Sequence, residues 1–311
     1  MKPKVSIVVP TYGREGVLLE TLRHLRALEP APDEILVVDQ TPDHEDGTRS
    51  QLQALRRAGA IRWMCLAKPS IPRAMNVGLV HANSERVLFL DDDIVPCAAL
   101  VGAHAEAGAH GPSIVVAGQV LQPGEAPEPL EGNGFAFRSS LAQPIGQVMG
   151  GNFSVDRELA LAIGGFDESF LGAAYCFEAD FSRRALAAGA TIQFEPEASI
   201  RHLRTERGGT REHGSHLRTI RPLHAVGEFY YLLRHRPIGW FSAISRRPLR
   251  SIATRFHARH PWWIPVTLVA EISGLLLALR LALGRPRLLS PAYRTSDTSA
   301  IAGVSEEAAR P

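Results

Sequence analysis

The stretch VLFLDDD at residues 87–93 joins an apolar run to three consecutive carboxylates. Four apolar residues in succession predict a buried strand, and the carboxyl ends of strands in open α/β sheets face the crevice where ligands bind. Adjacent carboxylates repel one another, so they indicate a bound positive charge, and Mg²⁺ or Mn²⁺ prefers such oxygen ligands. The alternative is an acidic turn that caps the next helix. The strand in front favours the ligand site.

Alternating strand and helix patterns surround this stretch. Strands are predicted over residues 4–9, 34–38, 61–65 and 86–90, and helices over 17–28, 51–58 and 74–82. Further along, helices are predicted over 159–163 and 177–188, strands over 191–194 and 199–201, and an irregular surface loop over 122–134. This alternation predicts an α/β fold with a mostly parallel sheet covered by helices.

Charge is segregated along the 311 residues. Residues 1–200 carry a net charge of −9, whereas residues 201–260 hold 13 Arg against 3 Glu, a net of +10. The asymmetry predicts an acidic, metal-using body and a basic surface that meets an anionic partner. The three cysteines form no CxxC pair, which indicates neither a disulfide framework nor a zinc site. No nucleic-acid-binding motif accompanies the arginines, so we expect no nucleic-acid partner.

Seven short motifs follow one another in a characteristic order. They are SIVVPTY (6–12), ILVVD (35–39), PSIPRAMNVG (69–78), DDD (91–93), GGN (150–152), GGFDE (164–168) and FEADFSRR (177–184). Together they resemble the family 2 glycosyltransferases of the GT-A fold, from about residue 5 to residue 202. No G-x-G-x-x-G follows the first strand and no P-loop occurs, so dinucleotide-binding and P-loop folds are not supported.

The resemblance implies a donor site and a metal site. The residues it implies for nucleotide and donor binding are Pro10, Thr11, Tyr12, Asp39, Arg73, Asn76, Asp91, Asp92 and Asn152. Asp39 would accept a hydrogen bond from the base, although a turn or cap role is the alternative. Asp93 and His202 would ligate Mn²⁺ or Mg²⁺, which acts as a Lewis acid on the leaving diphosphate; an ordinary surface histidine is the alternative for His202.

The general base is expected in the FEADFSRR motif. Aligned without gaps, the motif places Glu178 at the base position and Asp180 at a later acidic position. Phe177 stands where the family has the first acid of a pair, so the choice between the two carboxylates stays open, with Glu178 favoured. Both acids would also suit the amino-terminal dipole of a helix without any catalytic role.

The resemblance therefore implies a hexosyltransferase-type enzyme. It would transfer one sugar at a time, with inversion, from a UDP-, GDP- or dTDP-linked donor to a hydroxyl of a glycan or lipid-linked acceptor, as in polysaccharide or cell-envelope synthesis. The absence of a Q-x-x-R-W motif agrees with non-processive transfer. A nucleotidyltransferase on a similar sheet and a nucleotide-sugar-binding protein without turnover are the alternatives.

The carboxyl-terminal third has a different character. Residues 262–283 are apolar except for Glu271 and Arg280 and are long enough to span a bilayer. An early Pro265, the charge of Glu271 and the preceding basic segment favour instead a helix that lies in or on an anionic membrane, and a core helix is the alternative. We expect three regions: a GT-A domain over 1–205, a basic and aromatic helical membrane-associating region over 206–284, and a flexible tail over 285–311.

The expected location follows from these features. The first apolar run, over residues 5–9, ends at Pro10 and is too short for a signal-peptide core. We therefore expect a cytoplasmic protein that is peripheral at the inner face of the plasma membrane.

Overall fold

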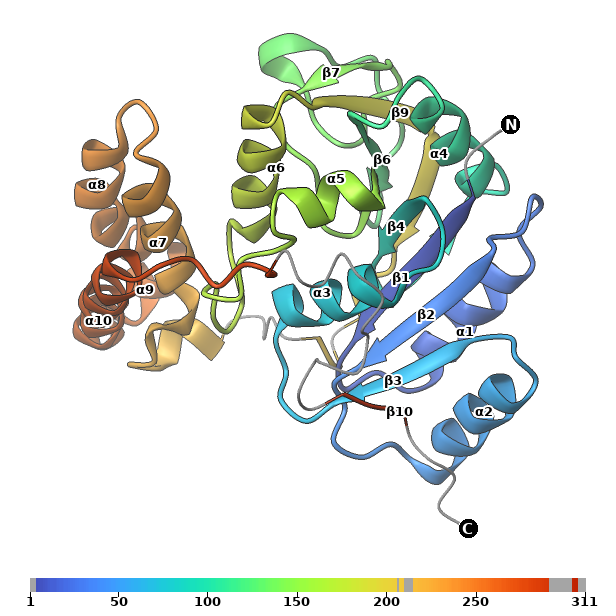
Figure 1. The fold of residues 1–311 in the computed structure, drawn as a ribbon. Coiled ribbons are helices and arrows are strands. Elements are labelled where there is room, and N and C mark those ends of the chain that lie inside the picture. The colour runs from blue at the N-terminus through green and yellow to red at the C-terminus, as the bar shows by residue number, and fades with distance from the viewer. Residues whose placement is uncertain (1–3, 206, 210–214, 291–303, 307–311) are drawn as a thin grey trace.

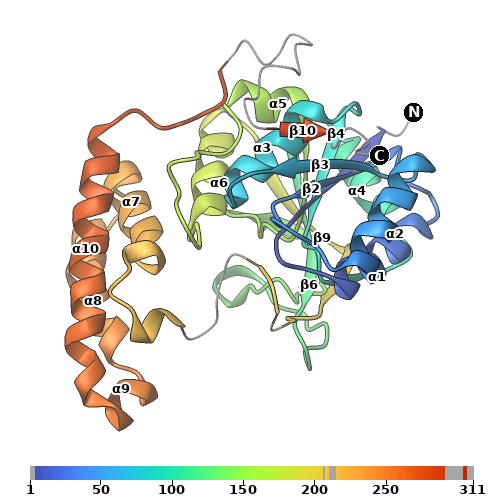
Figure 2. The same ribbon diagram turned by 90° about the horizontal axis from the view of Figure 1, so that it is seen from below.

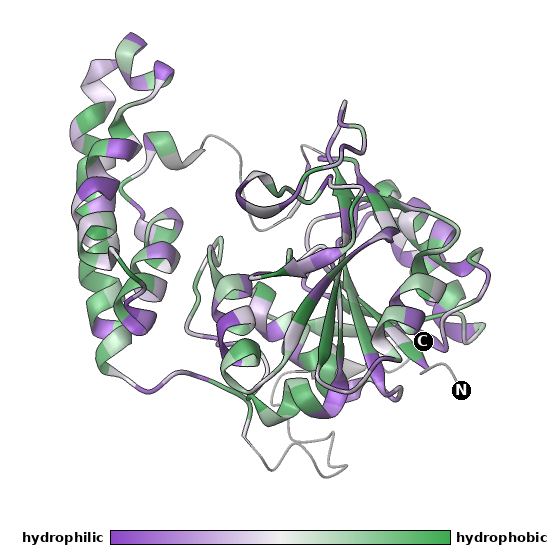
Figure 3. Ribbon diagram, turned by 90° about the horizontal axis from the view of Figure 1, so that it is seen from above, coloured by the Kyte–Doolittle hydropathy of each residue, from purple (hydrophilic) through white to green (hydrophobic). Residues whose placement is uncertain are grey.

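The computed structural model describes residues 4–205, 207–209, 215–290 and 304–306. Residues 4–205 form an α/β sheet domain, and residues 215–283 form a separate bundle of helices, called here the helical unit (Figures 1 and 2). The α/β fold with flanking helices is thus confirmed. The apolar residues of the sheet domain concentrate in the central strands (Figure 3).

The described strands form one mixed sheet. Its order is β10-β3-β2-β1-β4-β8-β6-β9-β5, and β7 pairs with β9 off this path. The bounds are β1 Val5–Thr11, β2 Glu34–Asp39, β3 Arg62–Leu66, β4 Arg86–Leu90, β5 Ile94–Pro96, β6 Ile114–Leu121, β7 Gln143–Ile145, β8 Asn152–Asp156, β9 Thr191–His202 and β10 Val304–Glu306. The segment β3-β2-β1-β4 is parallel, as predicted, and β8 joins β4 antiparallel.

Helices cover both faces of this sheet. In the sheet domain they are α1 Gly16–Arg26, α2 Asp46–Arg57, α3 Ile71–His81, α4 Leu100–Gly108, α5 Arg157–Ala162 and α6 Phe177–Ala187, with a short η1 at Gly132–Gly134. Side chains alternate along β1: Ile7 and Val9 pack in the core that contains α1 and α4, and Val8 packs in the core that contains α3 and α6. A strand buried on both faces explains why its sequence is continuously apolar.

Several predicted boundaries differ from the structure. The two strands predicted over 191–194 and 199–201 are one strand, β9, whose register with β6 shifts between Gly118 and Gln119. The shift lets the strand pass Pro196 without a break, as a bulge allows. The helix predicted from residue 51 begins at Asp46. Its first turn is polar, so the apolar periodicity on which the prediction rests does not extend to it.

The helical unit is attached to the sheet domain by a shared apolar core and by polar contacts. It consists of η2 Ser215–Arg218, η3 Pro222–His224, α7 Val226–His235, α8 Trp240–Ile252, α9 Arg255–Arg259, η4 Pro261–Trp263 and α10 Ile264–Leu283. On α7, the hydroxyl of Tyr230 donates to Asp167 at 2.7 Å, and His235 lies 2.7 Å from Asp180. Both partners belong to the sheet domain.

Within the predicted tail over 285–311, the described residues make backbone contacts with the sheet domain. The backbone N–H of Arg287 donates to Asp167, and that of Leu289 donates to the carbonyl of Gly164. β10 then adds to the edge strand β3. The remainder of the predicted tail lies outside the described residues. Residues 285–290 are therefore a strap that returns from α10 to the sheet domain.

Gly78 decides how closely α3 approaches β1. A Cβ at this position would lie 2.2 Å from Cγ1 of Val8 in the buried core. We predict that Gly78→Ala lowers the free energy of unfolding by about 1–3 kcal/mol, measured by urea titration, because the helix must move off the sheet. Gly47→Ala is the matched control. That glycine lies in α2 with open space around it, and alanine there should be neutral or stabilising by up to about 1 kcal/mol. Equal losses in the two variants would contradict the packing argument.

Candidate active site

The topology brings the ends of six strands to one edge of the sheet. β1, β2 and β4 are parallel neighbours, so the turns that follow them lie side by side. β8 runs antiparallel to β4 and begins where β4 ends, with Asn152 opposite Leu90. β5 follows the acidic triplet and pairs with the end of β9, with Ile94 opposite His202. Motifs that are far apart in the sequence therefore meet at this edge.

A cavity of about 330 Å³ opens at this edge. Its polar and turn-forming lining includes Pro10, Thr11, Tyr12, Arg14, Gln40, Asp91, Asp92, Asp93, Gly150, Gly151, Glu178, His202, Arg204 and Thr205. Eight of the predicted site residues are in this set. The other five (Asp39, Arg73, Asn76, Asn152 and Asp180) do not line the cavity.

Arg14 forms ion pairs with two of the three carboxylates of the acidic triplet. Its Nε lies 3.1 Å from Oδ1 of Asp92, and its Nη2 lies 3.1 Å from Oδ2 of Asp93, with all three side chains buried. Nη1 donates to the backbone carbonyls of Thr205 and Arg207 and to the Thr205 hydroxyl. One guanidinium thus connects the turn after β1, the turn after β4 and the segment after β9. A fork of five donors is suited to such bridging.

Asp93 is the most heavily engaged carboxylate of the triplet. Its Oδ2 accepts from the backbone N–H and the hydroxyl of Thr205, at 3.0 and 2.9 Å, as well as from Arg14. Nε2 of His202 lies 3.0 Å from its Oδ1. Burial opposes ionisation of Asp93, but His202 and Arg14 outweigh it and hold its pKa below the ordinary value. Burial favours neutral His202, yet Asp93 and Asp91 raise the pKa of the imidazole.

Asp91 and Asp92 have contrasting environments. Asp91 is half exposed, and its carboxylate packs so closely on Gly151 that a Cβ there would lie 2.1 Å from Oδ2. Asp92 is buried, and burial raises its pKa to about 7 despite the nearby Arg14. Asp91 is therefore the member of the triplet that faces solvent in the cavity.

The chemistry of Asp93 and His202 fits a divalent cation. Oδ1 of Asp93 is buried and accepts no hydrogen bond of good geometry, and it faces the imidazole, a common Mn²⁺ ligand. Within the described residues, no three His, Cys, Asp or Glu side chains form a complete metal site. Such an incomplete protein shell is usual where substrate phosphates supply the other ligands.

The two candidate bases lie in different environments. Glu178, in the first turn of α6, lines the cavity next to Gly150. Asp180 is buried outside the cavity: Arg184 donates to its Oδ2 at 2.7 and 2.9 Å, and His235 lies 2.7 Å from its Oδ1. Burial would raise the pKa of Asp180, but His235 and Arg184 outweigh it and hold it below the ordinary value. Asp180 is thus a structural anchor for α7, which leaves Glu178 as the carboxylate within reach of a ligand.

Asp39 lies beneath the cavity and has its oxygens already occupied. Its Oδ1 accepts from the backbone N–H of Thr41, and its Oδ2 accepts from Trp63 Nε1 at 2.9 Å and lies 2.7 Å from Nε2 of His44. Gln40, the next residue, reaches the cavity instead. The structure therefore assigns Asp39 the support of the turn after β2, and a contact with a nucleotide base stays a prediction.

The two predicted asparagines hold loops in place. Asn76 on α3 exchanges hydrogen bonds with the backbone of Phe166, which fixes the GGFDE segment against the helix. Asn152 on β8 bonds His104 and the carbonyls of Gln119 and Ala198. Both side chains are buried in these hydrogen bonds, and their contact with the donor stays a prediction. Arg73 is half-buried on α3, outside the cavity lining.

The sequence interpretation missed Arg14, Gln40 and Thr205. Each stands within three residues of the end of β1, β2 or β9. Three clustered carboxylates require a neighbouring cation. The available signal for Arg14 was therefore its position just after β1, the strand that pairs with β4 and ends beside the acidic triplet.

Comparisons with known proteins identify a family and a similar fold. A model of the family "Glycosyl transferase family 2" matches residues 6–163. The fold is similar to that of GalNAc-T7, solved with UDP, GalNAc and Mn²⁺, with a TM-score of 0.55 and 12% identity over 75% of this chain. This chain spans 50% of that protein's length. The mannosyltransferase PcManGT from Pyrobaculum calidifontis, in complex with GDP-Man and Mn²⁺, gives a TM-score of 0.53 and 19% identity, covering 95% of this chain and 83% of that one. No curated protein matches the sequence.

The buried cluster under the cavity makes stability depend on pH. Burial favours neutral His44, but Asp39 and Glu15 raise its pKa above 6.5; burial favours protonated Asp39, but His44 lowers its pKa below 3.8. At pH values between these two pKa values, His44 and Asp39 are both charged and form an ion pair. It is lost as the pH rises through the folded-state pKa of His44 or falls through that of Asp39.

We therefore predict that His44→Gln is less stable than the wild type by about 1.5–3 kcal/mol near pH 5–6, and that this difference narrows above pH 7. The free energy of unfolding, measured in urea across this range, tests the prediction. The same substitution at the exposed His110 is the control and should leave the profile unchanged. If the difference in the free energy of unfolding between His44→Gln and the wild type widens at alkaline pH, His44 is not a charged partner of Asp39 in the folded protein.

Proposed function

The chain belongs to glycosyl transferase family 2, and from this we propose that it transfers one sugar residue, with inversion, from a nucleotide diphosphate donor to an acceptor hydroxyl, with help from a divalent cation. The observation that carries the proposal is the shared cavity. Its lining combines Asp93 and His202 with Glu178 and the turn after β1. A metal-bound diphosphate and a base are the two groups that such a displacement needs.

The protein's part in the reaction follows from these positions. The turn after β1 and Gln40 would receive the nucleotide, and Asp93, His202 and the half-exposed Asp91 would hold the cation. A bound cation neutralises the charge that develops on the departing diphosphate.

Glu178 accepts the proton of the acceptor hydroxyl as that oxygen attacks the anomeric carbon. The bond from this carbon to the diphosphate oxygen breaks, and its electron pair leaves on the nucleoside diphosphate. A single displacement of this kind inverts the anomeric centre.

We propose an acceptor that is a glycan or is linked to lipid, used at the cytoplasmic face of a membrane. The support is the basic segment over residues 201–260 and one described helix, at residues 261–283, which is long and apolar enough to cross a bilayer. The first experiment is a panel of UDP-, GDP- and dTDP-sugars, assayed for nucleoside diphosphate release with Mn²⁺, Mg²⁺ or EDTA. Release of pyrophosphate instead would indicate a nucleotidyltransferase.

The roles of Glu178 and Asp180 can be distinguished by the effects of substitutions on turnover and on stability. We predict that Glu178→Gln lowers kcat by about 10²–10⁴-fold with little change in donor binding, because only the proton acceptor is lost. Asp180→Asn should chiefly lower the thermal midpoint, because it weakens the contacts with Arg184 and His235. The exposed Glu158→Gln, on α5, is the control. Full activity in Glu178→Gln would exclude this carboxylate as the base.

The metal site can be tested without turnover. We predict that Asp93→Ala weakens binding of Mn²⁺ together with a nucleoside diphosphate by at least about tenfold, measured by electron paramagnetic resonance of free Mn²⁺, and that His202→Ala has a smaller effect. Glu158→Gln again serves as the control. Unchanged Mn²⁺ binding in Asp93→Ala would contradict the proposed ligand set.

A further inference from the structure

The helix α10 leaves a row of large apolar residues exposed, which is unusual for a helix of a water-soluble protein, although Leu275, Leu277 and Leu281 pack partly against the core. The residues that it buries are small or polar: Thr267, Ala270, Glu271, Gly274 and Ala278. The opposite side is exposed and mostly apolar. Its exposed apolar residues, together with Trp262 in the preceding η4, are called here the apolar stripe: Trp262, Val269, Ile272, Leu276, Leu279 and Leu283. Their spacing of three, four or seven residues places them on one side of the helix. The exposed Arg280 flanks this stripe. A soluble helix would turn such a stripe towards the core.

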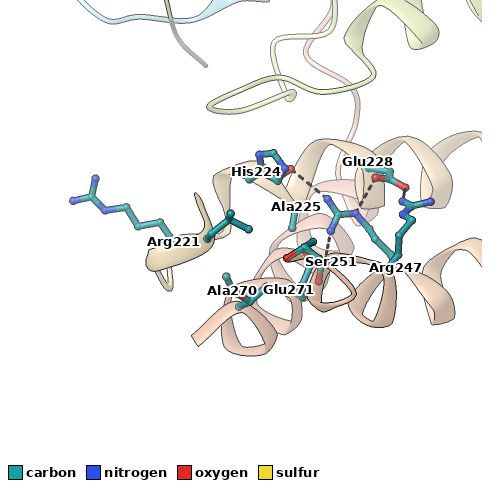
Figure 4. A pocket seen from close by; sticks show the side chains of 12 residues that line it. Arg221, His224, Ala225, Glu228, Arg247, Ser251, Ala270 and Glu271 are labelled. Atoms are coloured by element: carbon teal, nitrogen blue, oxygen red, sulfur yellow. Dashed lines mark hydrogen bonds and ion pairs between the residues drawn. The ribbon is translucent and has the colours of Figure 1, made fainter. Parts of the chain in front are cut away.

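The polar side of α10 is held firmly by the rest of the helical unit. Arg247 on α8 is buried and forms an ion pair with Glu271, and it also donates to Glu228 on α7 at 3.0 Å (Figure 4). At the start of α10, Oγ1 of Thr267 lies 2.8 Å from Nε2 of His257. Further along, Gly274 allows close approach to α7, since a Cβ there would lie 2.7 Å from Cβ of Ala225. Rotation of the helix to hide the stripe would break these contacts.

The ion pair between Arg247 and Glu271 changes how the helix relates to a membrane. Glu271 faces protein, so its charge does not prevent the opposite side from entering hydrocarbon. Pro265, which the sequence suggested as an interruption, lies in the first turn, where proline is compatible with a helix. In this structure α10 is therefore continuous from Ile264 to Leu283 and neither kinked nor enclosed.

Charge identifies the partner. The apolar stripe belongs to the helical unit, whose residues 215–283 hold ten Arg against two Glu, a net charge of +8, and Trp262 and Trp263 stand just before α10. Arginines around an apolar face attract anionic lipid headgroups, and tryptophan prefers the interface between headgroups and acyl chains. α7 lies between α10 and the sheet domain, and α10 runs along the outer side of the unit (Figure 2). The stripe thus faces away from the catalytic cavity.

The arginines of the neighbouring helix α8 indicate how α10 would lie relative to a bilayer. Arg247 contacts Glu271 near the middle of α10, and the arginines on either side of it on α8, Arg246 and Arg250, are exposed. If α10 crossed the bilayer, these two charges would lie near the centre of the hydrocarbon, where charged side chains are costly. If α10 lies in the plane of the membrane, they remain at the level of the headgroups.

We propose that the apolar stripe of α10 inserts in the plane of an anionic lipid bilayer and docks the enzyme on it. This inference deepens the proposed use of a membrane-borne acceptor and rests on that proposal for its biological role. The surface of the bilayer would then lie along the helical unit, with the sheet domain on its aqueous side.

Flotation of the full-length protein with vesicles tests the docking. We expect co-flotation with vesicles that contain phosphatidylglycerol and little with phosphatidylcholine alone. The double variant Ile272→Glu/Leu276→Glu should lower the partition coefficient by at least about tenfold. Leu141→Glu/Leu186→Glu makes the same chemical change at two exposed leucines of the sheet domain and should float like the wild type. Equal flotation of both double variants would overturn the proposal.

Depth measurements distinguish the orientations. Fluorophores on cysteines at positions 262, 272 and 283, in a variant whose three native cysteines are serine, should be quenched to a similar extent by one lipid nitroxide if the helix lies in plane. Deep quenching at 272 with shallow quenching at both ends would indicate a spanning helix and overturn the orientation. A lipid-free dimer that the Glu variants dissociate, together with absent flotation, would assign the stripe to a second copy of the chain instead.

Nucleoside diphosphate release in detergent separates this inference from the catalytic proposal. The stripe variants should retain it, because the stripe lies outside the cavity. Flotation without any turnover in the wild type would leave the docking intact and refute the transferase proposal.

Discussion

The architecture of the cavity depends on the neutralisation of three adjacent carboxylates. Repulsion among Asp91, Asp92 and Asp93 would splay the turn after β4, and Arg14 prevents this with ion pairs to the two buried members. A buried ion pair is stable only when its remaining hydrogen-bonding capacity is also used. The backbone of Thr205 and Arg207 meets that requirement, so the segment after β9 closes on the same guanidinium. One charge constraint thereby assembles three segments into a site.

A second pair of buried charges fixes the helical unit to the sheet domain. Asp180 stands only two residues from the proposed base, and it binds both Arg184 on its own helix and His235 on α7. Asp167 plays a similar role for Tyr230 and for the strap at Arg287. The position of the basic, apolar surface relative to Glu178 is therefore set by contacts made on α6 itself. The helical unit and the cavity are held at one orientation by these hydrogen bonds and by a shared apolar core rather than by a flexible linker.

Some residues of the sequence motifs line the cavity, and others hold the surrounding loops in place. Pro10, Thr11, Tyr12 and the acidic triplet line the cavity, whereas Asn76 and Asn152 use their amides to join loops to α3 and β8. A buried amide left without partners is costly. A polar residue inside an apolar motif therefore signals a satisfied hydrogen-bond network as often as a ligand contact. Motif position alone does not distinguish these two uses, because both place a polar side chain near the end of a strand.

The sequence by itself determined the strands β1 to β4 and β9, most of the α-helices and the edge of the sheet where the site lies, whereas β5 to β8 and β10 were not predicted. The predicted features follow from local periodicity and from the rule that parallel strands present their carboxyl ends together. Only the tertiary structure decided which side chain serves which purpose. Glu178 and Asp180 are two residues apart and chemically alike, yet one enters the cavity and the other meets Arg184 and His235. The orientation of α10 is likewise invisible in an almost uniformly apolar run, because the ion pair of Glu271 with Arg247 joins residues from different helices. Local pattern specifies elements, whereas contacts between distant residues specify roles.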